Sequence, residues 1–202
     1  METNNKYFYD VDKLNYLQVF NRYPITLERG KGARVWDVEG NEYIDALAGI
    51  AVNSIGHCHP DVVEAISTQS GKLIHISNFY LSKPQVILSE KLTTLSGLER
   101  VFLTNSGAES VEGAIKLARK YAHTIGRGGT ILSFEGSFHG RTMATIATGK
   151  KAMQKGFEPI PEGFKQIPFN NIDAVKAAAK SDVAAILIEP IQADVVNPQT
   201  GK

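Results

Sequence analysis

The chain has 202 residues, of which 43% are hydrophobic and 21% charged, and its formal net charge is +1. These values are typical of a globular protein long enough to bury a core, and they give no electrostatic reason to expect binding to nucleic acid or a membrane. The single cysteine, Cys58, excludes an internal disulfide. It lies between His57 and His59, but neighbouring residues at a turn point in different directions, so no metal site is expected. No signal peptide or membrane span is evident, and we predict a cytoplasmic location.

The first part of the chain predicts a short helix followed by an antiparallel meander. Apolar residues within 14–20 favour the helix. Three short strand-like runs follow it, at 25–28, 34–37 and 43–45. Turn sequences containing glycine separate these runs. A further helix is predicted from Pro60, because the first turn of a helix accepts proline.

From Pro84 onward, the predicted helices and strands alternate. Helical spacing of apolar residues predicts helices over 84–97, 106–123, 142–147 and 172–180. Strand-like runs occur at 101–104, 130–134 and 183–188. The last of these runs is wholly apolar, which is typical of a buried parallel strand. The alternation predicts an α/β fold with a mostly parallel sheet covered on both faces, and it divides the chain into segments 1–83 and 84–202.

One junction between a predicted strand and a helix has the features of an anion site. Ser106 is a good helix N-cap, and Glu109 lies where a capping box requires an acid. The backbone amides of Gly107 and Ala108 are little shielded, and the positive end of a helix dipole attracts phosphate. Taken alone, the segment is more simply explained as a well-capped helix. Its spacing excludes the Walker phosphate loop and the dinucleotide fingerprint.

A second group of functional side chains follows the next predicted strand, within residues 137–142. Ligands of open α/β sheets bind beyond the carboxyl ends of the strands, so this loop and the phosphate segment are expected to face one ligand. Phe138 is suited to stacking on a flat ring, and the Arg141 guanidinium is suited to holding a carboxylate. Core packing of Phe138 and a surface role for Arg141 are the alternative interpretations.

Five motifs carry a resemblance to a known family. They are Asn53-Ser-Ile-Gly-His-Cys-His-Pro60, Ser77-Asn-Phe-Tyr80, the segment from Asn105 to Arg119, Phe138-His-Gly-Arg-Thr142 and Ile188-Glu-Pro-Ile-Gln192. In this order they resemble the class III aminotransferases, most of all their acetylornithine and ornithine members. The resemblance implies the fold of the fold-type I transferases that depend on pyridoxal 5′-phosphate (PLP). It also implies a homodimer and the transfer of an amino group from N-acetylornithine to 2-oxoglutarate.

The resemblance also implies roles for individual residues. Those implied to bind the cofactor are Ser106, Gly107, Ala108, Phe138, His139, Glu189 and Gln192. Those implied to contact the substrate are Arg141, Asn53, Ser54, Tyr80 and Asp194. In the family the helix start holds the phosphate, the aromatic residue stacks on the pyridine ring, the glutamine lies by the ring oxygen and the arginine binds the substrate α-carboxylate. Asp194 aligns with a glutamate that helps ornithine members to admit ω-amines. Because aspartate is the shorter acid, succinylated donors, ornithine and 4-aminobutyrate remain open as alternatives.

The family further uses a lysine that carries the cofactor and an aspartate that pairs with the pyridinium nitrogen. Both are expected after Gln192, and neither is found before Lys202. We therefore expect no catalytic residue in the printed chain, which would then be the front half of an enzyme, a truncated product or one half of a split enzyme. Lys150 and Lys151 are interpreted as surface lysines. A non-catalytic module that binds the cofactor phosphate or a partner chain is the alternative.

Overall fold

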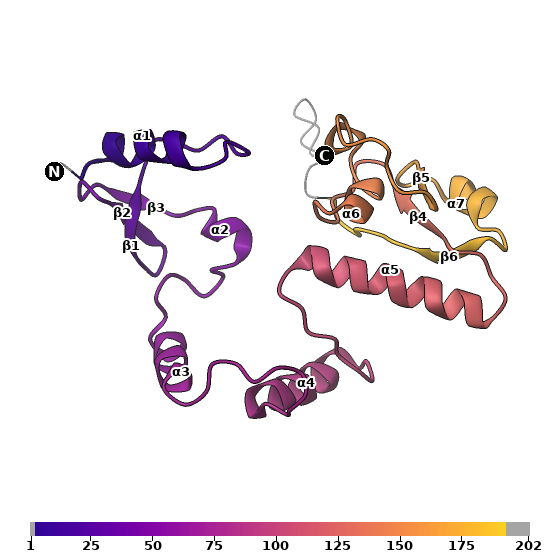
Figure 1. The fold of residues 1–202 in the computed structure, drawn as a ribbon, viewed down its shortest axis with the longest axis horizontal. Helices are drawn as coiled ribbons and strands as arrows, with labels where there is room; N and C mark the ends of the chain where they lie inside the picture. Colours follow the sequence, from indigo (N-terminus) through magenta and orange to yellow (C-terminus); the bar gives the residue numbers. More distant parts are fainter. Residues whose placement is uncertain (1–2, 193–202) are drawn as a thin grey trace. The chain divides into compact units, whose positions relative to one another are not determined.

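The computed structural model describes residues 3–192 of the chain. The chain divides into two compact units, Met1–Val86 and Ile87–Lys202, each with a sheet of its own (Figure 1). Helix α4 (Lys83–Ser96) crosses the boundary between the units. Within residues 3–192, no helix is long and apolar enough to cross a membrane.

An antiparallel sheet organises the first unit. Its strands are β1 (Leu27–Lys31), β2 (Arg34–Asp37) and β3 (Glu42–Ile44), paired in the order β1-β2-β3. Its helices are α1 (Asn5–Asn15), α2 (Ala48–Ala51) and α3 (Pro60–Ser70). The meander and the helix that begins at Pro60 confirm the prediction from the sequence.

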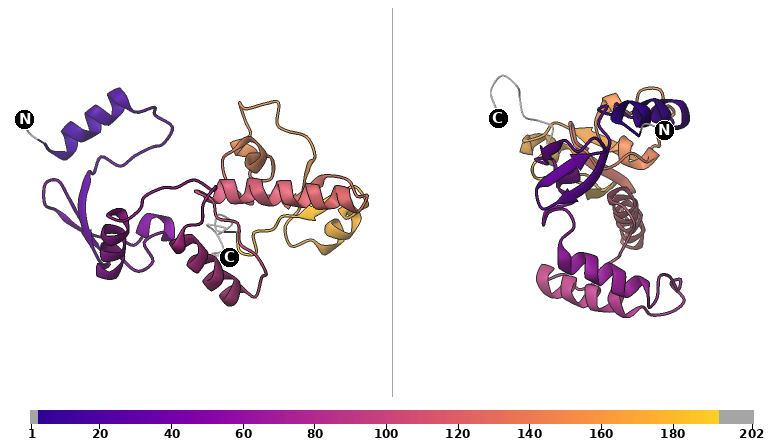
Figure 2. Two further views of the ribbon diagram at one scale, coloured as in Figure 1. Left: turned by 60° about the horizontal axis from the view of Figure 1, so that its bottom comes forward. Right: turned by 90° about the vertical axis from the view of Figure 1, so that its left-hand side faces the viewer.

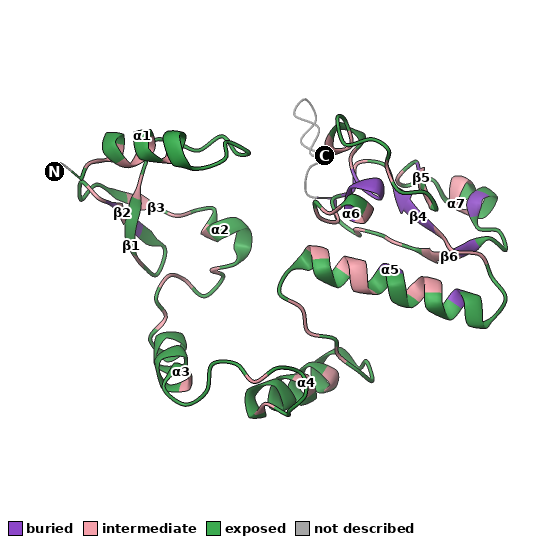
Figure 3. Ribbon diagram, in the orientation of Figure 1, coloured by how far each residue is buried: buried purple, intermediate pink, exposed green. Residues whose placement is uncertain are grey.

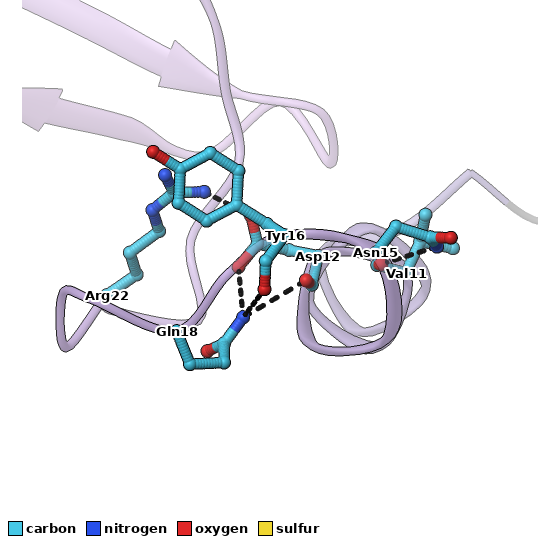
Figure 4. A network of polar contacts seen from close by, with 6 residues as sticks. All are labelled: Val11, Asp12, Asn15, Tyr16, Gln18 and Arg22. Atoms are coloured by element: carbon cyan, nitrogen blue, oxygen red, sulfur yellow. Dashed lines mark hydrogen bonds and ion pairs between the residues drawn. The ribbon is translucent and has the colours of Figure 1, made fainter.

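The first helix was predicted in the wrong place. Helix α1 begins at Asn5, where the side chain of Asn4 accepts a hydrogen bond from the Tyr7 amide. It ends at Asn15, so it overlaps the predicted helix at residues 14–15 only. Beyond this end, Gln18 Nε2 donates to the carbonyl oxygens of Asp12 (3.1 Å) and Tyr16 (2.8 Å), as Figure 4 shows. The Asp12 carbonyl also accepts from the Tyr16 amide at 2.8 Å, so Gln18 adds a second donor at this helix end and supplies one to the Tyr16 carbonyl.

Asp37 holds the meander together. This carboxylate is 2% exposed and accepts hydrogen bonds from Asn5 Nδ2 (2.9 Å), Asn41 Nδ2 (3.0 Å) and Tyr43 Oη (2.8 Å). Burial alone would raise the pKa of Asp37, but the hydrogen bonds outweigh burial and hold the pKa well below its ordinary value. The charged form of Asp37 therefore ties α1 to the sheet.

A parallel sheet organises the second unit. Its strands are β4 (Thr130–Phe134), β5 (Phe164–Ile167) and β6 (Val183–Ile186), in the order β5-β4-β6. Its other elements are α5 (Gly107–Thr124), α6 (Met143–Ala147), the 3-10 turn η1 (Lys151–Met153) and α7 (Ile172–Ala178). The α/β class and the parallel sheet confirm the prediction, although β5 was not predicted.

Helices cover both faces of this sheet. On one face Leu132 and Phe134 pack with Ala178 of α7. On the opposite face, the Arg119 guanidinium of α5 lies 4.6 Å from the ring centroid of Phe164. Phe164 pairs with Ile131 of β4, and successive side chains of a strand point to opposite faces, so Phe164 and Leu132 lie on different faces. Figure 2 (left) shows α5 running alongside β6, and Figure 3 shows the buried residues of this unit gathered around the sheet.

Two predictions for the second unit were wrong in part. Residues 101–104 form no strand, because no segment within residues 3–192 pairs with them, and Phe102 is 75% exposed. A strand requires a hydrogen-bonded neighbour, which an apolar run alone does not provide. The run at 183–188 is a strand only as far as Ile186. It is also not fully buried, because β6 lies at an edge of the sheet and both Ile186 and Ile188 are about half exposed.

Candidate active site

The start of α5 has the geometry of an anion site. Ser106 Oγ accepts a hydrogen bond from the Glu109 amide (3.2 Å), and Glu109 Oε2 accepts one from the Asn105 amide (2.7 Å). These contacts form the predicted capping box. Among the described residues, the amides of Gly107 and Ala108 have no acceptor, and a Cβ added to Gly107 would meet no atom within 4 Å. Two amides without an acceptor therefore lie at the positive end of the helix, and the space beside Gly107 is open.

The loop after β4 packs against this helix start. Gly140 has a φ of +128°, and a Cβ added there would lie 2.9 Å from Ala108 Cβ. Thr142, the N-cap of α6, donates from its hydroxyl to Glu112 Oε1 of α5 at 2.5 Å. The segment 138–141 is therefore held beside the start of α5, as the sequence led us to expect.

The segment that follows β6 joins the same region. Glu189 Oε2 accepts a hydrogen bond from the Phe138 amide (2.9 Å). Gln192 is buried, and its Nε2 donates to the Glu135 carbonyl (3.1 Å) and to Ser137 Oγ (2.8 Å). Three segments that are distant in sequence thus meet beyond the carboxyl ends of β4 and β6, where open α/β sheets bind their ligands.

Two buried polar atoms in this region, His139 Nε2 and Gln192 Oε1, have no partner among the described residues. Burial lowers the pKa of His139 below its ordinary value and so favours the neutral imidazole, although the charge of Glu189 acts in the opposite direction. Buried polar atoms normally have partners, and a polar ligand would supply them here. With the free amides at the helix start and the partly exposed ring of Phe138, these atoms fit a phosphorylated aromatic cofactor such as PLP.

The residues expected to contact substrate are divided along the chain. Arg141 is exposed in the loop after β4, so it belongs to the unit that contains the phosphate segment. Asn53, Ser54 and Tyr80 belong to the first unit. Asp194 lies outside the described residues.

The backbone just before Asn53 and Ser54 is unusual. Ala48, Ile50 and Ala51 have φ values of 50°, 58° and 64°, a region that residues with a Cβ rarely adopt. Ser54 Oγ donates to the Ala51 carbonyl at 2.5 Å and so braces this turn. Strained backbone persists only where its surroundings fix it, and it is often found at functional sites. Nothing in the residue types of this segment had indicated the strain.

The turn that contains His57 is held by a polar pair. His57 Nε2 lies 2.6 Å from Asp45 Oδ2, and this hydrogen bond is the main reason why the pKa of Asp45 is lowered. The imidazole packs on Gly30, where an added Cβ would lie 2.7 Å from His57 Cγ. In the described part of the chain, no three His, Cys, Asp or Glu side chains are grouped as metal ligands.

Sequence comparison gives one family and a consistent set of relatives. Residues 17–196 match the family model of the class III aminotransferases. The acetylornithine aminotransferase of Methanocaldococcus jannaschii is 53% identical over 188 residues, which are 92% of this chain and 47% of that protein. The acetylornithine aminotransferase of Methanothermobacter thermautotrophicus is 50% identical over 195 residues, or 95% of this chain and 49% of that protein. The chain thus spans about half the length of the curated relatives it matches.

Solved structures agree with the sequence relatives. The ornithine aminotransferase of Toxoplasma gondii, whose active site is partly occupied by PLP, matches 94% of this chain and 46% of its own, with a TM-score of 0.88 and 32% identity. The N-acetylornithine aminotransferase of Stenotrophomonas maltophilia matches 91% of this chain and 44% of its own, with a TM-score of 0.71 and 42% identity. These matches confirm the predicted fold-type I architecture over about half of the relatives' length.

Proposed function

Because the chain belongs to the class III aminotransferase family, we propose that it binds PLP and contributes the cofactor-binding part of an enzyme that transfers an amino group from N-acetylornithine to 2-oxoglutarate. The observation that carries this proposal is the meeting of the α5 start, the loop after β4 and the segment after β6 within one unit. When bound, the cofactor supplies an electron sink and carries the transferred amino group.

Each of these segments has a proposed task. The amides of Gly107 and Ala108, with the Ser106 hydroxyl, bind the phosphate, which their freedom from other acceptors supports. Phe138 covers one face of the pyridine ring, and its ring is 42% exposed and so open to contact. His139, Glu189 and Gln192 surround the cofactor, and the unpartnered Gln192 Oε1 offers a buried acceptor.

We further propose that Arg141 binds the substrate α-carboxylate. A guanidinium can make two parallel hydrogen bonds to a carboxylate, and the loop that carries Arg141 is fixed on both sides, at Gly140 and Thr142. Substrate contacts are also assigned to Asn53, Ser54, Tyr80 and Asp194. The strained turn that Ser54 braces supports this assignment for the first two of these residues.

The identity of the amino donor can be tested directly. Curated relatives at 53% and 50% identity are acetylornithine aminotransferases, which favours N-acetylornithine. Ornithine is the second candidate, because the Toxoplasma ornithine enzyme has the higher TM-score, 0.88 against 0.71 for the Stenotrophomonas protein. Glutamate formation from 2-oxoglutarate should be measured on the protein purified from its native source with N-acetylornithine, ornithine and 4-aminobutyrate. A larger kcat/KM for ornithine would overturn our choice of donor.

The cofactor-carrying lysine is proposed to lie outside these 202 residues. The chain should be incubated with PLP, reduced with borohydride to fix any lysine link, and analysed by peptide mapping. We expect no stoichiometric modification at Lys150 or Lys151. Stoichiometric modification of either residue would refute their assignment as surface lysines. We also propose that residues 84–202 are the cofactor-binding domain of an enzyme that acts as a homodimer. Light scattering on the native protein tests the homodimer.

A further inference from the structure

Glu112 has no role in the proposed binding of phosphate, ring or substrate, yet it contacts the loop that serves them. It lies on α5 about one and a half turns from the helix start. Its Oε1 accepts a hydrogen bond of 2.5 Å from Thr142 Oγ1. The same hydroxyl oxygen caps α6 by accepting from the Thr145 amide (3.3 Å). One hydroxyl group therefore connects a carboxylate on α5 to the start of α6.

A second contact lies on the other side of Arg141. Gly140 approaches α5 so closely that an added Cβ would lie 3.1 Å from Ala108 Cα and 2.9 Å from Ala108 Cβ. The loop is thus fastened to α5 immediately before and immediately after Arg141. The contact before it is steric, and the contact after it is a hydrogen bond to a carboxylate, a kind that is stronger than a neutral one.

We propose that Glu112 is a positioning residue that fixes the distance between the phosphate-binding amides of α5 and the 138–142 loop. This inference rests on the proposed binding of PLP. The covalent structure of a pyridoxal cofactor sets the distance from its phosphate to its ring. A ligand of this shape contacts both segments only if the protein keeps them at the matching distance, so the gain from Glu112 comes from preorganisation.

This role separates two ligands that share a phosphate group. Inorganic phosphate requires only the amides of Gly107 and Ala108 and the Ser106 hydroxyl. Pyridoxamine 5′-phosphate requires the amides and the loop together, and it forms no covalent link with lysine side chains. Loss of the Glu112 contact should therefore weaken binding of pyridoxamine 5′-phosphate and leave binding of inorganic phosphate unchanged.

The test is calorimetric titration of the 202-residue chain with each of the two ligands. Glu112→Ala should weaken pyridoxamine 5′-phosphate about tenfold, the effect of losing one hydrogen bond to a charged group. Glu112→Gln keeps an acceptor and should recover most of that loss. Lys116→Ala, an exposed change on the same helix, is the matched control and should bind both ligands as the unmodified chain does.

Each contrary outcome has a distinct meaning. Unchanged binding of pyridoxamine 5′-phosphate by Glu112→Ala would overturn the positioning role. Equal weakening of both ligands would also overturn it, because it would show that Glu112 supports the helix start itself. Failure of the unmodified chain to bind pyridoxamine 5′-phosphate would instead refute the proposed cofactor site, and the inference with it.

Discussion

Replacing Gly140 with alanine tests how tightly the loop after β4 packs on α5. The φ of Gly140 is +128°, a value that residues with a Cβ do not readily adopt. The new Cβ would lie 2.9 Å from Ala108 Cβ and 2.9 Å from Thr145 Oγ1. Ala108 Cβ is fixed to the backbone and cannot rotate away, so either the loop or the helix has to move.

The cost of Gly140→Ala has two parts. Forcing alanine into this backbone region costs about 1–3 kcal/mol. Overpacking of a close contact costs a further ~1–3 kcal/mol. Taking the middle of each range, we expect the free energy of unfolding of the second unit to fall by about 4 kcal/mol. Affinity for pyridoxamine 5′-phosphate should fall as well, because the displaced loop carries Phe138 and Arg141.

Gly156→Ala is the matched control, because Gly156 also has a positive φ, +87°, but an added Cβ would meet nothing within 4 Å. It should cost only about 1 kcal/mol. Hydrogen exchange of the β4 amides in increasing urea measures the local free energy of opening in both variants. The difference between them contains the steric contact with Ala108 and Thr145 together with the greater backbone cost at Gly140. Equal losses in the two variants would refute the close packing of the loop on α5.

Three further outcomes follow from single side chains. Arg119→Lys removes guanidinium hydrogen bonds to the carbonyls of Gly129 (2.9 Å) and Gly163 (3.1 Å). Hydrogen exchange of the β4 amides should therefore show a local free energy of opening that is lower by about 2 kcal/mol. An unchanged free energy would contradict the role of Arg119 in fastening α5 to the sheet. The pKa of Asp37 is depressed in the fold, so its stabilising contribution is complete above its unfolded pKa of about 4 and is lost as the pH falls towards the folded pKa. Fluorescence of Trp36, the one tryptophan of the chain, should therefore show an acid transition in this range that Asp37→Asn makes shallower, and identical acid profiles would exclude Asp37 as its source. Because burial lowers the pKa of His139, its imidazole should titrate by NMR below 6.5, and a midpoint at or above that value would contradict its burial.

Local signals in the sequence predicted the elements that form the proposed phosphate site. Ser106 and Glu109 are separated by the spacing that a capping box requires, and the two resulting hydrogen bonds are present. Strand β4 was predicted at its observed bounds, Thr130–Phe134, from a short apolar run that begins after a glycine-containing loop. The capping box depends on residues only a few positions apart, so a sequence displays it directly.

Features that depend on distant partners were not predictable in this way. The run at 101–104 has strand-like residues but no paired neighbour among the described residues, and α1 ends where Gln18 and Asp12 meet. The contact between Glu112 and Thr142 joins residues 30 positions apart, and neither residue type singles itself out. The positive φ values of Ala48 and Ile50 also follow from their surroundings, since these residues favour other conformations when isolated.

The proposed cofactor binding does not depend on the covalent chemistry. The proposed contacts to phosphate and ring, together with Arg141, all come from residues of one unit, which are joined by hydrogen bonds such as that from the Phe138 amide to Glu189. None of these contacts requires a lysine, because hydrogen-bond donors and an aromatic face are sufficient to hold a phosphorylated ring. The chain should therefore bind pyridoxamine 5′-phosphate while forming no stoichiometric lysine link with PLP. That pair of results distinguishes a cofactor-binding part of an aminotransferase both from a complete catalyst and from a chain that binds no cofactor.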